Sequence, residues 1–304
     1  MSDALQAAAD VSFADIESAL ALRDEHTGMA APPRALTATI VAVGPDARVA
    51  EAARPLQRLA ESGGVRAIAI AHGSSSETRA RVSAGFVALE GLPPEFIDNA
   101  VAAIRLSSLP TIVWWRGGAV EVLDRVVALA DRVVLDVEAP EKDLWPHVIT
   151  ILDRTAFSDL RWTRLTRWRA LTAQLFDLPG VAAAAASFTE LRIEGADRPT
   201  ARLFAGWLQT SLEWKDSVKI DIVDSRRDAP IEAVNLTSDA IELRVCLAGS
   251  RQCVETSARV PGQAATSRVV SLGSQGLESL LSEELRIRSR DAAFERALRA
   301  CLSS

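Results

Sequence analysis

Hydrophobic and polar residues alternate in two different ways along this chain, and the change falls near residue 156. Between residues 35 and 156, short apolar runs rich in β-branched residues alternate with amphipathic segments. The runs predict strands and the amphipathic segments predict helices. The predicted strands are 36–43, 65–71, 101–106, 111–115 and 133–137, and the predicted helices are 46–62, 120–130 and 142–153. This order is typical of an α/β domain with a largely parallel sheet and right-handed crossovers.

After residue 156 most of the predicted strands follow one another at hairpin spacing, which favours an antiparallel-rich α+β domain. The predicted strands are 187–194, 217–223, 231–236, 240–247, 252–257 and 268–271, with helices from Asp197, at 275–286 and at 291–302. Ahead of both domains, Ser12 caps a predicted helix, and a linker with glycine and prolines follows it. The expected organisation is therefore an arm (1–34), an α/β domain (35–156) and an α+β domain (157–304).

The second domain opens with a segment that predicts one long helix, from Ser158 to Phe176. Ser158 is a favourable N-cap, and the run 178–180 (Leu-Pro-Gly) ends the helix. With 100° between successive residues, the large apolar side chains gather on one broad face. They are Leu160, Trp162, Leu165, Trp168, Leu171, Leu175 and Phe176. Arg161 and Arg164 project onto this same face, and Arg167 and Arg169 flank it.

An arginine on a buried face needs a partner, because an unpaired buried charge is costly. One interpretation is that Arg161 and Arg164 pair with acidic residues inside the protein. The other is that the helix meets another macromolecule or an anion, since Arg and Trp are enriched at binding hot spots. On that interpretation the binding residues are Arg161, Trp162, Arg164, Arg167 and Arg169.

Two further candidate sites lie where predicted strands end. Trp114, Trp115 and Arg116 precede two glycines, and they are either core residues beside a turn or an exposed anchor for a partner. The loop His72-Gly73-Ser74-Ser75-Ser76 could hold a phosphate with its backbone amides and hydroxyls. The alternative is an ordinary polar surface loop. Both segments are expected at the carboxyl edge of the sheet, where α/β proteins place their sites.

Composition narrows the function classes. A net charge of −6 does not support nucleic-acid binding, and the longest uncharged runs are too short to span a bilayer. The first residues lack the features of a signal peptide, so a cytoplasmic location is expected. The cysteines Cys246, Cys253 and Cys301 form no CxxC motif and are expected to be reduced thiols, although Cys246 and Cys253 could approach each other across a hairpin.

The chain carries no catalytic motif that we recognise. It lacks a GxGxxG motif after a strand, a GxxxxGK[ST] motif and a GxSxG motif. Its three histidines, His26, His72 and His147, are far apart in the sequence. We therefore expect no catalytic site, no cofactor and no metal.

Three segments carry a resemblance to a known family. The run from Asp159 to Arg169 reads Asp-Leu-x-Trp-x-Arg-Leu-x-x-Trp-Arg and is followed by Leu-Phe-Asp at 175–177. Together with the Trp-Trp segment at 109–117 and the strand at 131–136, it resembles the signature of the OpcA family. Arg167 stands where that signature is expected to have a proline, and the segment 64–68 keeps only the arginine of a His-Pro-x-Arg pattern.

The resemblance implies a protein that binds glucose-6-phosphate dehydrogenase, an enzyme of the oxidative pentose phosphate pathway, and promotes its assembly or activity. The missing catalytic motifs and the Arg/Trp-rich segments fit such a binding protein independently. The alternative hypothesis is a sugar-phosphate or nucleotide-binding enzyme that uses the sheet edge of the first domain, with His72, Ser74–Ser76 and Arg116 as ligands.

Overall fold

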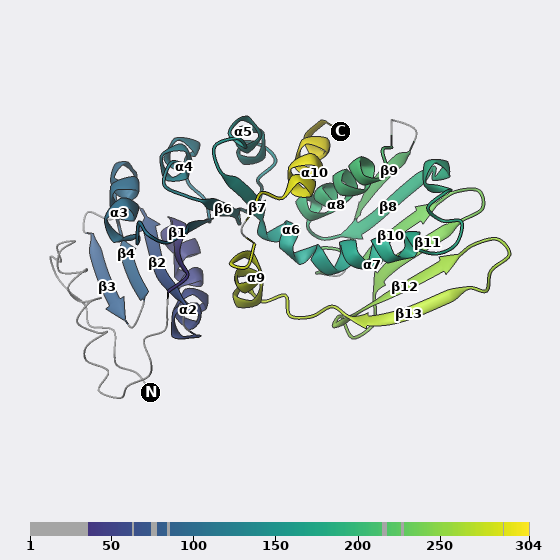
Figure 1. The fold of residues 1–304 in the computed structure, drawn as a ribbon, viewed down its shortest axis with the longest axis horizontal. Coiled ribbons are helices and arrows are strands. Elements are labelled where there is room, and N and C mark those ends of the chain that lie inside the picture. Colours follow the sequence, from purple (N-terminus) through teal and green to yellow (C-terminus); the bar gives the residue numbers. More distant parts are fainter. Residues whose placement is uncertain are drawn as a thin grey trace. The chain divides into compact units, whose positions relative to one another are not determined.

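The computed structural model describes residues 36–62, 64–73, 78–83, 86–214, 218–225, 228–287 and 289–303. They form two compact units (Figure 1). The first unit contains the residues up to Glu138 together with Ile151–Asp159 and Leu277–Arg290. The second contains Ala139–Thr150, Leu160–Gly276 and the residues from Asp291 onward. The expected arm at 1–34 lies outside the described residues, and the expected domain boundaries stay a prediction.

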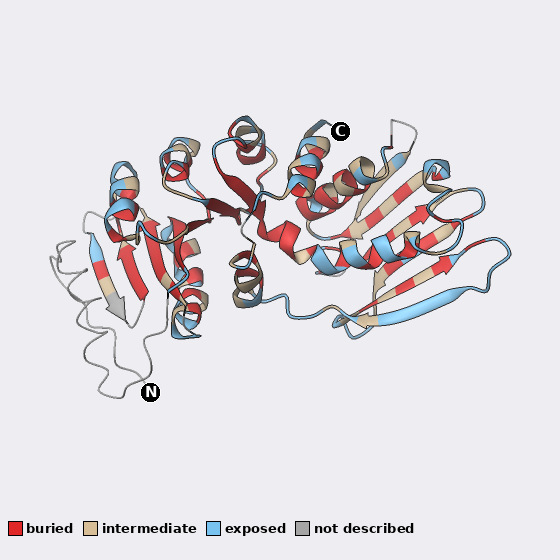
Figure 2. Cartoon of the chain, viewed as in Figure 1, coloured by how far each residue is buried: buried red, intermediate tan, exposed pale blue. Residues whose placement is uncertain are grey.

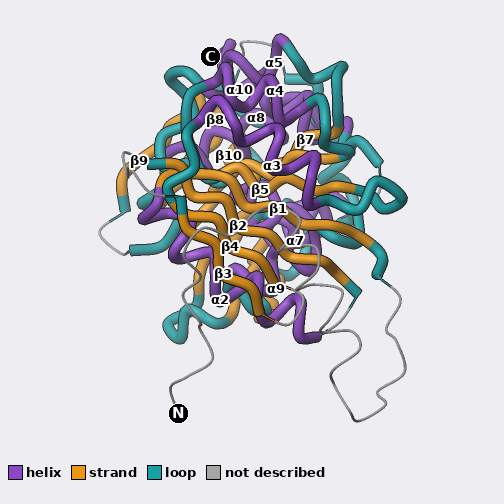
Figure 3. The backbone as a smooth tube through the Cα atoms, turned by 90° about the vertical axis from the view of Figure 1, so that its left-hand side faces the viewer, coloured by secondary structure: helices purple, strands orange, loops and turns teal. Residues whose placement is uncertain are grey.

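The first unit is built on a seven-stranded sheet with the order β3-β4-β2-β1-β5-β6-β7. The parallel strands are β1 (Ala38–Pro45), β2 (Val65–His72), β4 (Phe86–Glu90), β5 (Thr111–Trp115), β6 (Arg132–Leu135) and β7 (Ala156–Asp159). The edge strand β3 (Arg79–Ser83) pairs antiparallel with β4. The parallel strands follow the doubly wound order 3-2-1-4-5-6. Strand β1 therefore lies at the centre, between β2 and β5 (Figure 3).

The core of this unit lies along the central strands, where every residue of β5 and all but the last residue of β1 are buried (Figure 2). The helices of this unit are α2 (Asp46–Ser62), η1 (Pro94–Phe96), α3 (Ile97–Ile104), α4 (Val120–Val127) and α9 (Leu277–Glu284). The predicted strand at 101–106 is wrong, because most of that segment belongs to α3. Its buried residues are Ile97, Ala100, Val101 and Ile104, a helical spacing that starts ahead of the β-branched residues.

The second unit contains a six-stranded sheet with the order β13-β12-β11-β10-β8-β9. Its strands are β8 (Glu190–Gly195), β9 (Lys219–Asp224), β10 (Ala233–Thr237), β11 (Glu242–Leu247), β12 (Cys253–Arg259) and β13 (Thr266–Ser271). All neighbours pair antiparallel except β8 and β9, which are parallel. The predicted fold class, a largely parallel α/β part followed by an antiparallel-rich α+β part, is confirmed.

The helices of the second unit are α5 (Leu144–Thr150), α6 (Leu160–Arg164), α7 (Thr166–Phe176), η2 (Ala185–Ser187), α8 (Arg198–Ser211) and α10 (Ala292–Ser303). Helix α8 packs on α10 and contacts β8 and β9, while α7 contacts β11 and β12. Burial alternates along β8 and β12, so one face of the sheet is apolar and covered and the other is polar.

The predicted helix from Ser158 to Phe176 begins two residues later than expected and is divided in two. Ser158 and Asp159 belong to β7, which pairs with β6, so Ser158 is not an N-cap. Its hydroxyl is buried and donates to Glu284 Oε2 at 2.7 Å, which satisfies it inside the sheet. Leu165 separates α6 from α7. Thr163 of α6 is buried. Among the described residues, no helix is both long enough and apolar enough to cross a membrane.

Candidate functional site

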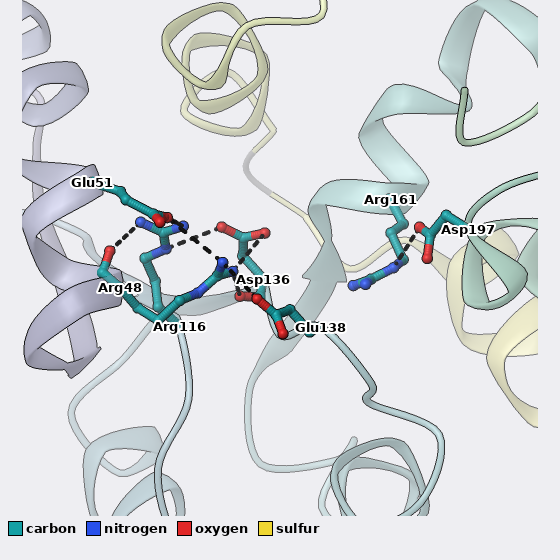
Figure 4. Close-up of polar contacts among 7 residues, drawn as sticks. All are labelled: Arg48, Glu51, Arg116, Asp136, Glu138, Arg161 and Asp197. Atoms are coloured by element: carbon teal, nitrogen blue, oxygen red, sulfur yellow. Dashed lines mark hydrogen bonds and ion pairs between the residues drawn. The ribbon is translucent and has the colours of Figure 1, made fainter. Parts of the chain in front are cut away.

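The carboxyl ends of β1, β5 and β6 carry a cluster of charged side chains around Arg116 (Figure 4). Arg116 directly follows β5, and its side chain is 2% exposed. Its Nε donates to Asp136 Oδ2 at 3.1 Å and its Nη2 donates to Glu51 Oε2 at 3.0 Å. Nη1 donates to the backbone carbonyl of Arg48, and the guanidinium lies 4.6 Å from the ring centre of Trp114. Every nitrogen of this buried guanidinium is therefore paired within the protein.

Arg48 extends the cluster toward solvent. Its guanidinium lies 3.3 Å from Glu138 and 3.6 Å from Glu51, and it also donates to the backbone carbonyl of Asp136 at 3.2 Å. Two arginines thus share three carboxylates across α2 and the end of β6. A buried guanidinium is tolerated because its charge and its hydrogen bonds are both satisfied here.

This cluster occupies the place where doubly wound folds bind a dinucleotide, the crevice beyond the central strands at the point where the strand order reverses. Such folds hold the pyrophosphate on a glycine-rich turn at a helix N-terminus. Here β1 ends at Pro45 and α2 begins at Asp46, so no turn separates them. A Cβ placed on Gly44 would lie 2.9 Å from the Cβ of Arg116, and a Cβ on Gly73 would clash with Asp46 Oδ2. Arg116 and its partners occupy this crevice, and Asp46 places a carboxylate at the N-terminus of α2, where such folds bind an anionic group. These residues do not fit a dinucleotide.

His72 lies beside the same strand ends but is already engaged. Its Nε2 lies 3.2 Å from the carbonyl oxygen of Gly117, and a Cβ on Gly118 would lie 2.7 Å from that nitrogen. Ser74, Ser75 and Ser76, the other expected anion ligands, lie outside the described residues. The role of these four residues in anion binding stays a prediction.

Trp114 and Trp115 are buried, at 0% and 1% exposure, so the interpretation as core residues beside a glycine turn describes their packing. Arg116 is also buried, at 3% exposure. The three residues do not form an exposed anchor, because all three side chains are buried. A role for them in partner binding stays a prediction.

Helix α6 makes two contacts with the starts of other helices in the second unit. Arg161 is buried, and its Nε donates to Asp197 Oδ2 at 2.9 Å, as Figure 4 shows. Asp197 is the residue immediately before α8, and it also accepts a hydrogen bond from Thr200. The interpretation of Arg161 as an internal salt-bridge partner therefore describes its geometry.

The neighbouring residue, Trp162, binds the aspartate at the start of α10. Its Nε1 donates to Asp291 Oδ2 at 2.7 Å, while Asp291 Oδ1 accepts from the amides of Ala293 and Phe294 at 3.0 Å. The ring of Trp162 also packs against Phe294 at 5.8 Å. Consecutive residues of α6 thus bind the N-terminal aspartates of α8 and α10, two helices that pack on each other. Arg161 and Trp162, of which Trp162 belongs to the family signature, thus fix the starts of α8 and α10.

The other arginines of this segment lie closer to solvent. Arg169 stacks on Trp162, with its guanidinium carbon 3.6 Å from the ring centre. Arg164 is half-buried and Arg167 is exposed. Neither forms an ion pair or a side-chain hydrogen bond with the part of the chain that the structure describes. Of the expected partner-binding residues, Arg164 and Arg167 are therefore those with charges available to a partner.

The sequence did not predict that Arg116 pairs with Asp136 and Glu51. It also did not predict that Arg161 pairs with Asp197. Asp197 carried a signal, because it precedes a helix start with proline in the first turn. Its contact with Arg161 spans 36 residues, and no local pattern indicates it. Within the described ranges, no group of three or more His, Cys, Asp or Glu side chains is placed to hold a metal ion.

Comparison with known proteins shows which sequences this chain resembles. Residues 155–298 match a family model that describes the C-terminal domain of a glucose-6-phosphate dehydrogenase subunit. A protein of Nostoc punctiforme, provisionally named OxPP cycle protein OpcA, is 27% identical over 246 residues, which cover 67% of this chain and 53% of that protein. A protein of Synechocystis sp. with the same name is 24% identical over 250 residues, with coverages of 69% and 53%. The chain spans about half the length of these relatives.

Among solved structures, a Desulfitobacterium hafniense protein provisionally described as an NADPH-dependent oxidoreductase aligns with a TM-score of 0.50. The alignment covers 88% of this chain and 94% of that chain at 9% identity, so it shows a likeness of fold alone. The family match over residues 155–298 and the two curated relatives confirm the resemblance to the OpcA family that the sequence motifs predict.

Proposed function

We propose that this protein is a non-catalytic, cytoplasmic binding partner of glucose-6-phosphate dehydrogenase that promotes the assembly or the activity of that enzyme. The observation that carries the proposal is the match of residues 155–298 to a domain whose description names a subunit of this dehydrogenase. The name of the two curated relatives, OxPP cycle protein OpcA, supports the same association.

The geometry of the first unit supports a role without catalysis. Its fold resembles that of an oxidoreductase, but Arg116 and its partners fill the crevice in which such a fold would hold a dinucleotide. The alternative hypothesis, a sugar-phosphate or nucleotide-binding enzyme that uses this sheet edge, needs Arg116 and His72 as ligands. Both side chains already form hydrogen bonds within the protein, Arg116 with the Arg48 carbonyl and His72 with the Gly117 carbonyl. These contacts weigh against that alternative.

The solvent-facing side of α7 and the end of α6 form the surface that we propose for the partner. It carries Arg164 and Arg167, and the exposed residues of α7 continue it: Thr166, Ala170, Ala173 and Gln174 (Figure 2). Arginines without an internal partner keep their charge for carboxylates on another protein, and interface hot spots are enriched in arginine. Small side chains along the same helix let a partner approach its backbone closely.

The experiment is a binding and activity assay with the dehydrogenase of the same organism. We expect the two proteins to co-elute and the dehydrogenase activity to change on mixing. The Arg164→Ala/Arg167→Ala double variant should bind at least ~30-fold more weakly, a loss of ~2 kcal/mol in the hot-spot range. Its unfolding free energy should change by only about 0.5 kcal/mol per substitution, as for surface residues.

Arg58→Ala serves as the matched control, because Arg58 is an exposed arginine of α2 whose ion pair with Glu278 is also exposed. This variant should bind the dehydrogenase like the unmodified protein. Unchanged binding by the double variant would remove α7 as the interface and leave the partnership intact. No binding by the unmodified protein would overturn the proposed function itself.

A further inference from the structure

The second unit contains a pocket of about 370 Å³ between α8, β9 and α10 that the proposed function does not use. Its lining residues come from all three elements: Arg198, Arg202 and Gln209 from α8, Ile220 and Ile222 from β9, and Cys301 from α10. Small-molecule sites in proteins commonly enclose ~300–1,000 Å³. The pocket is therefore large enough for a small metabolite.

One side of the pocket carries two positive charges. Arg198 and Arg202 lie four residues apart in α8, so both project from the same side of the helix. Arg202 donates one hydrogen bond to the backbone carbonyl of Cys301, which orients its guanidinium. Arg198 is exposed and forms no ion pair with any described residue. None of the described residues that line the pocket is acidic. The two guanidiniums are therefore free to bind one anionic group, and paired arginines match a phosphate well.

One residue that lines the pocket has a polar atom that lacks a partner. Gln209 Oε1 is buried and forms no hydrogen bond with the described residues. A buried polar atom left unpaired costs free energy, so it needs a donor from elsewhere. A hydroxyl group satisfies this side chain in either orientation of its amide, because a hydroxyl both donates and accepts. The isoleucines of β9 provide an apolar wall for the carbon skeleton.

We propose that this pocket binds a sugar phosphate, with its phosphate on Arg198 and Arg202 and a sugar hydroxyl on Gln209. A phosphate suits the site better than a carboxylate, because two guanidiniums can neutralise its two charges. The site is independent of the proposed function: it needs neither the dehydrogenase nor the α7 surface.

The experiment measures the Tm of the full chain as a function of ligand concentration. The probes are glucose 6-phosphate, gluconate, inorganic phosphate and glucose. A ligand that binds only the folded protein raises the Tm in proportion to its affinity. We expect glucose 6-phosphate to give the largest rise, inorganic phosphate and gluconate smaller ones, and glucose none.

Variants then locate the binding. Arg198→Gln should weaken glucose 6-phosphate binding about tenfold, the equivalent of one charged hydrogen bond. Because Arg198 is exposed and unpaired among the described residues, this variant should fold normally. Gln209→Leu should weaken glucose 6-phosphate but leave inorganic phosphate unaffected. The control is Arg259→Gln, an exposed arginine of β12 that lies four strands from β9, roughly 19 Å away at the usual strand spacing.

Three results would overturn the proposal. The first is the absence of any concentration-dependent Tm rise with glucose 6-phosphate. The second is a rise that persists unchanged in Arg198→Gln. The third is an equal response to inorganic phosphate and glucose 6-phosphate that Gln209→Leu does not alter. If the small molecules fail while Arg198→Gln weakens dehydrogenase binding, the pocket receives an acidic side chain of a protein partner instead.

Discussion

Removal of Arg161 should destabilise the protein far more than removal of Arg164, although both arginines lie in the same short helix. The side chain of Arg161 is 9% exposed and pairs with Asp197, whose side chain is 28% exposed. Breaking a buried ion pair from one side typically costs ~3–5 kcal/mol, because the other charge stays buried. Asp197 keeps its hydrogen bond from Thr200 and part of its hydration. We therefore expect Arg161→Ala to cost about 3 kcal/mol, the low end of that range.

Arg164→Ala is the matched control, because this half-buried arginine forms no ion pair with the described residues. It should change the unfolding free energy by about 0.5 kcal/mol or less, as surface substitutions do. Asp197→Ala should also destabilise the protein, since it removes the carboxylate that pairs with the more buried of the two charges.

The measurement is urea denaturation followed by far-UV circular dichroism. A double variant, Arg161→Leu/Asp197→Leu, tests the reasoning further. Replacing both members of a buried ion pair by apolar residues is often nearly neutral, so this variant should be more stable than either single alanine variant. If Arg161→Ala costs less than ~1 kcal/mol, the pair behaves as a solvated one and the reasoning is refuted.

Three other predictions concern the remaining features. Trp162→Phe should lower the unfolding free energy by about 1.5 kcal/mol, because it removes the hydrogen bond to the Asp291 carboxylate. Trp168→Phe should lower it less, because the Trp168 indole forms no hydrogen bond with the described residues. Equal losses of thermal stability in the two variants would contradict this prediction. Titration with NADPH should give no saturable change in nucleotide fluorescence, because the Arg116 cluster occupies the crevice beyond β1 and β5 in which such folds bind a dinucleotide. A saturable signal would refute that interpretation. Oxidation with diamide should leave the thiols of Cys246 and Cys253 open to alkylation. In the β11–β12 pair Cys246 lies opposite Glu255, so Cys253 is only its diagonal neighbour, and the roughly 7–8 Å between such neighbours is too far for a disulfide. A disulfide-linked peptide in the mass spectrum would contradict this prediction.

The sequence predicted elements well where local pattern and tertiary packing agree. Helix α2 begins at Asp46 and ends at Ser62 as its amphipathic pattern indicates, and β5 spans Thr111–Trp115 as its apolar run indicates. The prediction failed at Ser158, whose preference for a helix N-cap gives way to pairing in β7. The carboxylate that makes this possible is Glu284, 126 residues away. Local patterns carry no information about such a partner.

The candidate site was predictable in its residue types but not in its geometry. The sequence indicated that Arg161 must be paired if it lies on the apolar face, and it lies there. Nothing local indicated that Asp197 accepts its hydrogen bond, or that Arg116 is enclosed by Glu51 and Asp136. Those contacts join elements that are far apart in the sequence, so they depend on how the elements pack in the folded protein.

The return of residues Leu277–Arg290 to the first unit has a consequence for synthesis of the chain on the ribosome. Arg132 in β6 and Ser158 in β7 both bond to Glu284, and Arg132 also donates to the carbonyl of Ser289. Synthesis must pass through the whole sheet of the second unit before these acceptors emerge. Until then Arg132 lacks its carboxylate, and burying it unpaired costs ~3–5 kcal/mol. The β6–β7 edge of the first sheet therefore packs late, and it stays exposed to chaperones while residues 160–284 are synthesised.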